Sequence, residues 1–441
     1  MTKDQSTSSQ TGQVSLAGAL SIGIGGMVGG GIFAVLGLAA LLGGGATPIA
    51  FLIAGLVALL TAYSYAKLSV AFPSRGGTVI FIDRAFGINF LTGSANNLLW
   101  ISYIVTLALY AVAFGNYAET FFGNQTGGVL LHILISAAII VPTLLNLLSA
   151  GLISKTETFV VAFKLAILIL VIIFGFSSVD PANLSPSTWQ PLPQIIAAGM
   201  LIFVAYEGFE LIANAAEDIR DYKRTLPKAF YGSVVFVIIL YVLISIVTVG
   251  TLTTQEIQSA ADFALAQAAK PSLGQLGFTL VAVSAVLATF SAINATLYGA
   301  ARLSYVIAKE GELPAFIERK VWRQPIEGLL ITAGLALLLA NFFNLESIST
   351  MGSAGFLIIF AIVNAANFAQ ADKVGSRRWL AGLGVLACLG ALGVLVWRTV
   401  QTNPSEVLIL VGMVGLASLI EGLYLRFKKD PHKQERITVS Q

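Results

Sequence analysis

Gly25-Gly26-Met27-Val28-Gly29-Gly30-Gly31-Ile32-Phe33 lies inside the first long apolar segment and decides the fold. Five of these nine residues are glycine, and each costs a helix interior about 1 kcal/mol relative to alanine. A single glycine in a membrane helix usually serves close helix packing. Five together predict a break, where released N–H and C=O groups must face protein or a ligand. An interrupted first helix is a pointer to a transporter site.

The composition indicates an integral membrane protein. The 441 residues are 56% hydrophobic and 11% charged, whereas soluble domains carry about 25% charge. The apolar stretches are continuous rather than alternating, which favours helices over a β-barrel. Cys388 is the one cysteine, so an intramolecular disulfide is excluded and packing is expected. With two histidines, the chain has no metal-ligand cluster, and no metal or cofactor is expected.

Twelve segments are long enough to span a bilayer. They are 15–41, 46–71, 92–121, 128–149, 154–177, 192–216, 227–251, 275–307, 325–344, 351–370, 378–398 and 405–426. The polar start is followed by an apolar stretch too long for a signal peptide, so no cleavable leader is expected.

The basic residues identify the two sides. Of 25 Lys and Arg, all but Lys164, Lys270 and Arg398 lie toward the termini and the loops that follow even-numbered helices. That side is predicted to be cytoplasmic, in the cell membrane, with both termini inside. The expected parts are an N-terminal tail 1–14, helices 1–5 at 15–177, helices 6–10 at 192–370, helices 11 and 12 at 378–426 and a basic tail 427–441.

A second break is expected in helix 6, over residues 203–210. Glu207 and Glu210 are two carboxylates inside an apolar segment, where charged residues normally face protein or water. Gly208 weakens the helix at the same place. This break comes five helices after the first. Because five is odd, the two units have opposite orientations, which is the pattern of an inverted repeat.

Five motifs in order resemble those of the amino acid–polyamine–organocation transporters, and of proton-coupled prokaryotic amino acid permeases in particular. They are Met27 to Phe33, Pro73 to Gly87, Phe203 to Glu210, Glu217 with Arg224 to Ala229, and Ala308 to Pro314. The resemblance covers helices 1 to 10. It implies an all-α, LeuT-like fold: a 5+5 inverted-repeat core with broken helices 1 and 6, plus two C-terminal helices. Two departures are Gly30, where serine is common, and Val79 with Phe81, where tyrosines are common.

The expected substrate is an amino acid, held mainly by backbone. Free N–H groups at the start of a half-helix suit a carboxylate, and Gly30 and Gly31 leave the backbone accessible. Released carbonyls of Met27, Phe203 and Tyr206 suit the ammonium. Phe203 either covers the substrate as a gate or is a structural aromatic. The predicted substrate-binding residues are Met27, Gly29, Gly30, Gly31, Phe203, Tyr206, Glu207 and Gly208.

Lys164 is the predicted proton-coupling residue. It lies nine residues past Lys155, roughly 13 Å deep at 1.5 Å per residue, where snorkelling to either face is difficult. Burial favours the neutral amine. The resemblance implies that this amine replaces the sodium of sodium-coupled relatives, with carbonyls from Gly25 and Val28 and a hydroxyl from Ser291. The alternative is a permanently charged structural lysine.

Several polar side chains leave alternatives open. Glu207 and Glu210 could bind a cationic substrate, act as a second proton site, or pair with Asn214 or Asn294. Tyr103, Tyr110 and Tyr117 share one face of helix 3, which favours packing over lining the pathway. Asn96 and Asn97 are candidates for interhelical hydrogen bonds.

The functional prediction is therefore a transporter rather than an enzyme, since no nucleophile, base and metal occur together. The first hypothesis is proton-coupled amino acid uptake by alternating access. The alternative is an exchanger, or a carrier of polyamines or other amines, without net proton flux. Small neutral amino acids are the expected substrates, with protons and the lipid bilayer as the other partners and no nucleic acid.

Overall fold

The computed structural model describes residues 13–123, 128–148, 153–314 and 326–428. Within these ranges the regular structure is helical, apart from two isolated β-bridges that pair Val14 with Ile219 and Gly44 with Trp189. Nine described helices are long and apolar enough to cross a membrane, and two bent pairs would raise the number to eleven. The chain is therefore a multi-pass membrane protein.

The structure describes seventeen α-helices in the ranges above. Their bounds are α1 Leu16–Met27, α2 Gly31–Gly43, α3 Thr47–Ala71, α4 Thr78–Phe86, α5 Phe90–Glu119, α6 Val129–Leu148, α7 Ile153–Gly175, α8 Leu192–Leu201, α9 Leu211–Asn214, α10 Tyr222–Thr251, α11 Thr254–Ser259, α12 Ala264–Lys309, α13 Ile326–Phe342, α14 Leu345–Ala369, α15 Ala371–Val374, α16 Arg378–Thr402 and α17 Pro404–Lys428. A short 3₁₀ turn, η5, covers Phe203–Tyr206 between α8 and α9.

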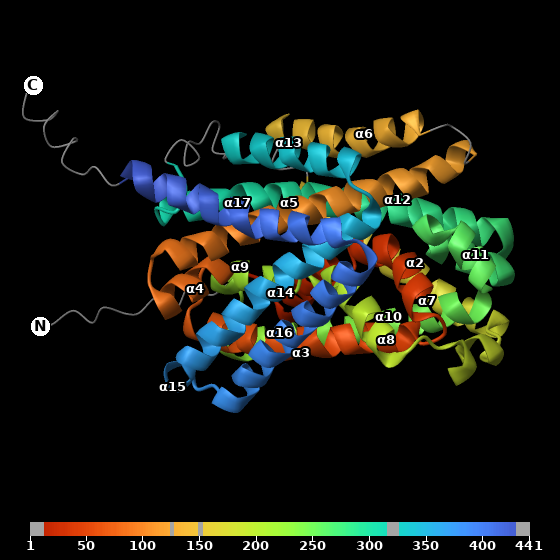
Figure 1. Ribbon diagram of the computed structural model, residues 1–441, viewed down its shortest axis with the longest axis horizontal. Helices are drawn as coiled ribbons and strands as arrows, with labels where there is room; N and C mark the ends of the chain where they lie inside the picture. Colours follow the sequence, from red (N-terminus) through yellow and green to blue (C-terminus); the bar gives the residue numbers. More distant parts are fainter. Residues whose placement is uncertain (1–12, 124–127, 149–152, 315–325, 429–441) are drawn as a thin grey trace, which may run out of the picture.

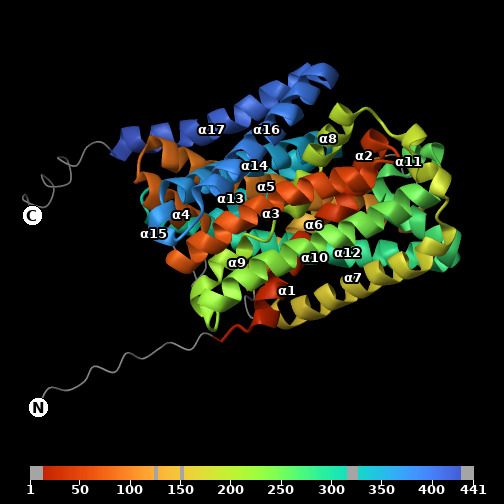
Figure 2. The same ribbon diagram turned by 90° about the horizontal axis from the view of Figure 1, so that it is seen from below.

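Helix α5 is the centre of the molecule. Its apolar window is 94% buried, and it packs against α12, α14, α17 and α6 (Figures 1 and 2). Helices α16 and α17 lie at the periphery, where their apolar windows are only 28% and 22% buried. Exposed apolar side chains such as Leu386 and Leu408 cover them. Such surfaces suit contact with lipid.

The predicted spans agree with the observed helices over most of the chain, with differences at α4, α14 and α10. Between the predicted helices 2 and 3, the expected loop contains the amphipathic helix α4, whose apolar side chains Val79, Phe81 and Ile82 are buried. Helix α14 begins at Leu345 because Asn344 caps it by accepting from the Ser347 N–H. Helix α10 begins at Tyr222, before the predicted residue 227. The predicted start at residue 275 agrees with the structure, because the non-helical residue Gly274 divides α12 into two helical segments. Helix α12 bends at Gly274, whose φ of +61° favours glycine.

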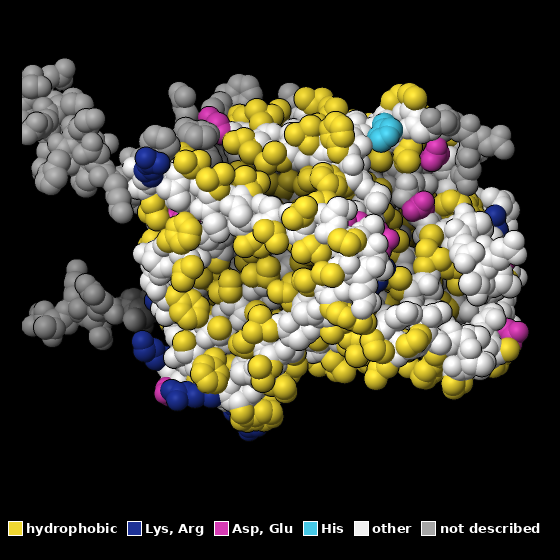
Figure 3. Space-filling model, viewed as in Figure 1, with side chains coloured by type: hydrophobic (Ala, Val, Ile, Leu, Met, Phe, Trp, Pro, Cys, Tyr) yellow, Lys and Arg dark blue, Asp and Glu magenta, His cyan; other side chains and the backbone are white. Residues whose placement is uncertain are grey.

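Both ends of the described chain lie toward the end of the molecule that carries α4 and α15 (Figures 1 and 2). On the face shown in Figure 3, most Lys and Arg side chains also gather at that end. The predicted tails 1–14 and 427–441 fall almost entirely outside the described residues, as do Arg319, Lys320 and Arg323.

Candidate functional site

Both predicted breaks are present. Helices α1 and α2 are separated by Val28, Gly29 and Gly30 and are bent by 47° relative to each other. The pair formed by α8 and the segment Phe203–Asn214 is bent by 51°. The five glycines of the stretch 25–33 weaken the helix here, because each glycine in a helix interior costs about 1 kcal/mol relative to alanine.

The two breaks touch each other through glycine backbone. A side-chain carbon added to Gly26 would lie 2.7 Å from the Gly208 carbonyl oxygen. Gly208 has a φ of +118°, which L-residues with a side chain rarely adopt, and a Cβ there would overlap Gly26. A Cβ on Gly31 would lie 2.8 Å from the Cα of Ala205. Close contact between the breaks therefore requires glycine on both sides.

A buried tyrosine joins the two broken helices. The Tyr241 hydroxyl, from α10, lies 2.7 Å from the Met27 carbonyl oxygen and 3.2 Å from the Ala205 carbonyl oxygen. Tyr241 is fully buried. Its hydroxyl supplies a partner for carbonyls that the breaks release, as a membrane interior requires. The Met27 carbonyl, a predicted ammonium ligand, is thus in contact with a protein hydroxyl in this structure.

Two serines of α14 hold the second break. Ser349 and Ser353 donate to the Leu201 carbonyl oxygen at 2.7 and 2.8 Å. The Ser353 hydroxyl also accepts from the Val204 N–H at 3.0 Å. Both serines are completely buried, so they replace backbone partners that α8 loses where it ends.

Glu207 and Glu210 bond to tyrosines of α5. The Tyr103 hydroxyl donates to Glu210 Oε1 at 3.0 Å, and the Tyr110 hydroxyl donates to Glu207 Oε2 at 3.3 Å. Glu210 Oε2 also accepts from the Gly208 N–H at 2.7 Å. Both carboxylates are buried, with 3% and 1% of Glu207 and Glu210 exposed.

These contacts add to two of the alternatives left open by the sequence. Tyr103 and Tyr110 are buried, as packing predicts, and their hydroxyls also donate hydrogen bonds to the two carboxylates. Asn214 and Asn294 are not the partners found for these carboxylates. Asn294 accepts from Asn146 at 2.7 Å, and Asn214 is exposed next to Gly77. Tyr117 does pack, with its ring edge-on to Phe33.

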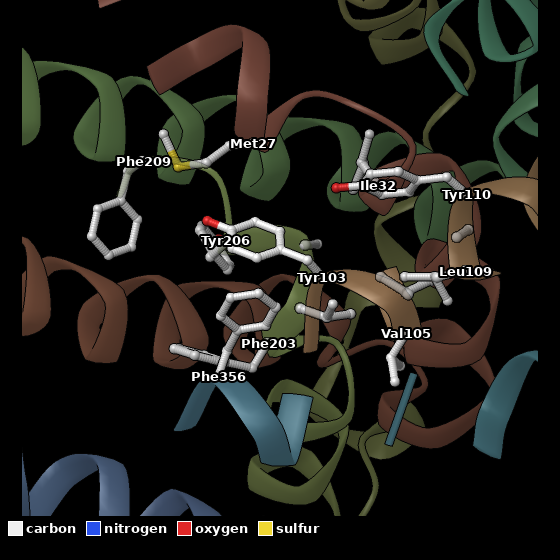
Figure 4. Close-up of a cluster of buried hydrophobic side chains, with 14 of the residues drawn as sticks. Met27, Ile32, Tyr103, Val105, Leu109, Tyr110, Phe203, Tyr206, Phe209 and Phe356 are labelled. Atoms are coloured by element: carbon white, nitrogen blue, oxygen red, sulfur yellow. The ribbon is translucent and has the colours of Figure 1, made fainter. Parts of the chain in front are cut away.

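Aromatic and aliphatic side chains fill the space between the breaks and α5 (Figure 4). Phe203 is fully buried, and the centroid of its ring lies 5.9 Å from that of the Phe360 ring. The predicted backbone site at Gly30 is covered by the Tyr110 ring, which occupies the space that a side chain there would need. Gly29 lies nearby, and a Cβ added to it would lie 3.1 Å from the Cβ of Ala292 on α12. The predicted binding residues are therefore together and sealed from solvent.

Lys164 lies beside the first break. It projects from α7 and is 2% exposed, and its Nζ donates to the Gly25 carbonyl oxygen at 3.0 Å. Gly25 also packs against α7, because a Cβ there would lie 3.1 Å from Val161 Cγ2. Val28 lies at the break, and Ser291 is half-buried on α12, a helix that packs against α7.

Sequence reasoning missed Tyr241, Ser349 and Ser353. Each residue carries a hydroxyl group inside an apolar span, and such hydroxyl groups often form hydrogen bonds between membrane helices. This pattern does not identify the partner, and the partners here are backbone groups released by distant breaks. The interhelical role expected for Asn96 and Asn97 is confirmed, since Asn96 donates to Asp83 of α4 and Asn97 donates to Glu421 of α17.

Comparison with known proteins identifies relatives along almost the whole chain. The family model described as amino acid permease matches residues 14–419. An uncharacterised protein of Methanocaldococcus jannaschii is 36% identical over 89% of this chain and 90% of its own length. The inner membrane transport protein YbaT of Escherichia coli is 33% identical over 93% and 95%. The methylthioribose transporter of Bacillus subtilis is 26% identical over 82% and 83%.

Proposed function

The chain belongs to the amino acid permease family, and on that premise we propose that it takes up amino acids across the cell membrane by alternating access, coupled to protons. Its relatives are transporters rather than enzymes. The proposed substrate has an α-carboxylate and an ammonium group, and small neutral amino acids fit a site lined mainly by glycine and buried aromatics. One relative is named for methylthioribose, so methylthioribose should be tested as a competitor of amino acid uptake.

The proposed architecture has twelve spans with both termini in the cytoplasm. Helix α13 would be the remaining span, since its 17 residues reach the lower limit for crossing a bilayer. The two bent pairs would be helices 1 and 6 of two inverted repeats, 15–177 and 192–370. Contact of the breaks through Gly26 and Gly208 supports a shared site at the repeat interface.

The observation that carries proton coupling is the bond from Lys164 to the Gly25 carbonyl. A protonated amine is a charge-assisted donor, and such bonds are roughly twice as strong as neutral ones. Loss of the proton would weaken the contact between α7 and the end of α1. Protonation would thereby hold the first break against α7, and deprotonation would release it.

The test is uptake by purified protein in liposomes, with an inward proton gradient, with sodium only, and with neither. We expect accumulation of labelled small neutral amino acids that requires the proton gradient and is unaffected by sodium. Uptake that requires only amino acid loaded inside would identify an exchanger without net proton flux.

Lys164→Met tests the residue itself. We expect at least a tenfold loss of proton-driven accumulation, because methionine keeps the side-chain volume but cannot bind a proton. Lys67→Met is the matched control, since Lys67 Nζ also donates to a backbone carbonyl, that of Gly375 at 2.8 Å, but outside the breaks. Full pH-dependent uptake by Lys164→Met would contradict the coupling role and leave Lys164 as a structural cation.

A further inference from the structure

Two acidic side chains outside the membrane-spanning segments, one on α4 and one in the loop after α12, meet an amide side chain near the start of α5. Asn96 Nδ2 donates to Asp83 Oδ1 of α4 at 3.0 Å and to Glu312 Oε2 of the loop at 2.6 Å. The Thr92 hydroxyl donates to Glu312 Oε1 at 3.4 Å. One amide nitrogen thus holds two carboxylates close together.

This cluster has more acceptors than donors. Glu312 and Asn96 are completely buried. Among the residues that the structure describes, no donor reaches the buried atoms Asp83 Oδ2, Asn96 Oδ1 or Asn97 Oδ1. A buried acceptor without a donor costs about 1–3 kcal/mol. A proton on either carboxyl group supplies a donor and removes one of two neighbouring negative charges.

The chemistry of the cluster favours a proton over a metal ion. In the described part of the chain, no group of three or more His, Cys, Asp or Glu side chains is arranged to hold a metal. Helix α5 contributes only neutral side chains here. Among the described residues, the charged groups that act on the pair are acidic: Glu310 in the same loop and Glu421 on α17. Arg84, the basic neighbour on α4, lies over the Phe72 ring instead.

Burial raises the pKa of Asp83 to about 7, and the charge of Glu312 adds to that rise. Burial likewise raises the pKa of Glu312 to about 7, although its hydrogen bond from Asn96 opposes the change. The pair would therefore exchange a proton near neutral pH, while an exposed carboxyl group has a pKa near 4.

The cluster connects the second break to the central helix. On one side, the segment before α4 is tied to the region after α9: Arg75 contacts Asp218 at 3.0 Å and Glu217 at 3.6 Å, and Gly77 lies against Asn214. On the other side, Asn96 and Asn97 belong to α5, and Asn97 donates to Glu421 of α17 at 3.3 Å. A change in charge between Asp83 and Glu312 therefore acts where these two parts meet.

We propose that Asp83 and Glu312 form a proton-binding site, joined by Asn96, whose occupancy holds α4 and the loop after α12 together against α5. When the proton leaves to water, two adjacent carboxylates repel each other and the contact opens. The site is separate from Lys164 and requires neither substrate nor a proton gradient.

The sign of the pH effect follows from the raised pKa. The closed contact binds a proton more tightly than the opened, hydrated carboxylates do, so lowering pH below about 7 favours closure. For one proton, the ratio of closed to open protein rises by up to tenfold for each pH unit. The rise ends near pH 4, where the exposed carboxyl groups of the open state also become protonated. Above about pH 7 neither state is protonated, and pH has no further effect.

The test measures a distance between spin labels at Ile88→Cys after α4 and Lys309→Cys at the end of α12, in a Cys388→Ala background. Ile88 and Lys309 are exposed, so both labels are tolerated. In the purified protein without substrate, we expect the shorter distance to gain population as pH falls from 8 to 5, with the change beginning near pH 7. Asp83→Asn together with Glu312→Gln should hold the shorter distance throughout this range.

Glu310→Gln is the matched control, since it removes a neighbouring charge without a bond to Asn96, and it should keep the pH response. Each single variant, Asp83→Asn or Glu312→Gln, repeats the test if the double variant is not monodisperse. A distance that ignores pH in the labelled parent would overturn the proposal. So would an unchanged pH response after both carboxyl groups are neutralised. Uptake is not measured, so either result is independent of proton-coupled transport.

Discussion

At the scale of single residues, glycine fixes how closely the two broken helices approach. Gly26 and Gly208 bring their backbones into contact where any side chain would overlap. The sequence predicts both breaks, because glycine clusters and buried carboxylates are visible in an apolar span. It does not predict that these two glycines face each other, since that contact joins residues far apart in the chain.

Gly208→Ala tests this contact. We expect at least a tenfold loss of uptake and lower thermal stability, because the methyl group overlaps Gly26 and alanine disfavours a φ of +118°. Overpacking typically costs 1–3 kcal/mol, before the backbone strain is added.

The control is Gly334→Ala in α13, where a Cβ would meet nothing within 4 Å. It should leave uptake unchanged and stabilise the helix by up to about 1 kcal/mol. Normal uptake by Gly208→Ala would show that the breaks separate without loss of function.

At the scale of elements, the breaks are stabilised by side chains of other helices. Tyr241 of α10 and the serines of α14 bond to backbone groups that α1 and α8 release. The order of apolar segments predicts these helices well. Their bonds escape prediction because a tyrosine or serine in an apolar span has the same sequence signature whether it bonds to its own helix or to another.

Ser353→Ala tests the support of the second break. The change leaves the buried Val204 N–H without its partner at 3.0 Å and removes one donor to the Leu201 carbonyl. We expect a loss of about 1–3 kcal/mol, measured as lower thermal stability of the purified protein, with weaker uptake.

Ser245→Ala is the matched variant. Ser245 is equally buried, but its hydroxyl donates to Val242 of its own helix at 2.8 Å. That helix retains its other bonds, so the change should cost no more than about 1 kcal/mol. Equal losses in the two variants would argue against a special role for Ser353.

At the scale of the whole molecule, charge and polarity divide the two ends. The distribution of Lys and Arg predicts both termini on the cytoplasmic side. At the opposite end, Arg398 is paired with Glu346 at 2.7 Å. Hydropathy alone predicts the positions of the membrane-spanning helices. It does not predict α4, because this helix has only nine residues.

Cysteine labelling tests the orientation. A membrane-impermeant maleimide added to intact cells should label Ser187→Cys, in the connection before α8, but not Arg377→Cys, before α16. Both positions are exposed in the structure, and the native Cys388 is fully buried. After the cells are opened, both variants should react. Labelling of Arg377→Cys from outside, without reaction at Ser187→Cys, would reverse the proposed orientation.

The bond from Tyr241 to the Met27 carbonyl also has a consequence for biosynthesis. Its partners are 214 residues apart, so at 5–20 residues per second the ribosome needs about 10 to 40 s to make the second after the first. During that interval Tyr241 is not available to bond the Met27 carbonyl. Until α10 arrives, that carbonyl needs another partner in the membrane, which an unbroken first helix supplies through the N–H four residues on.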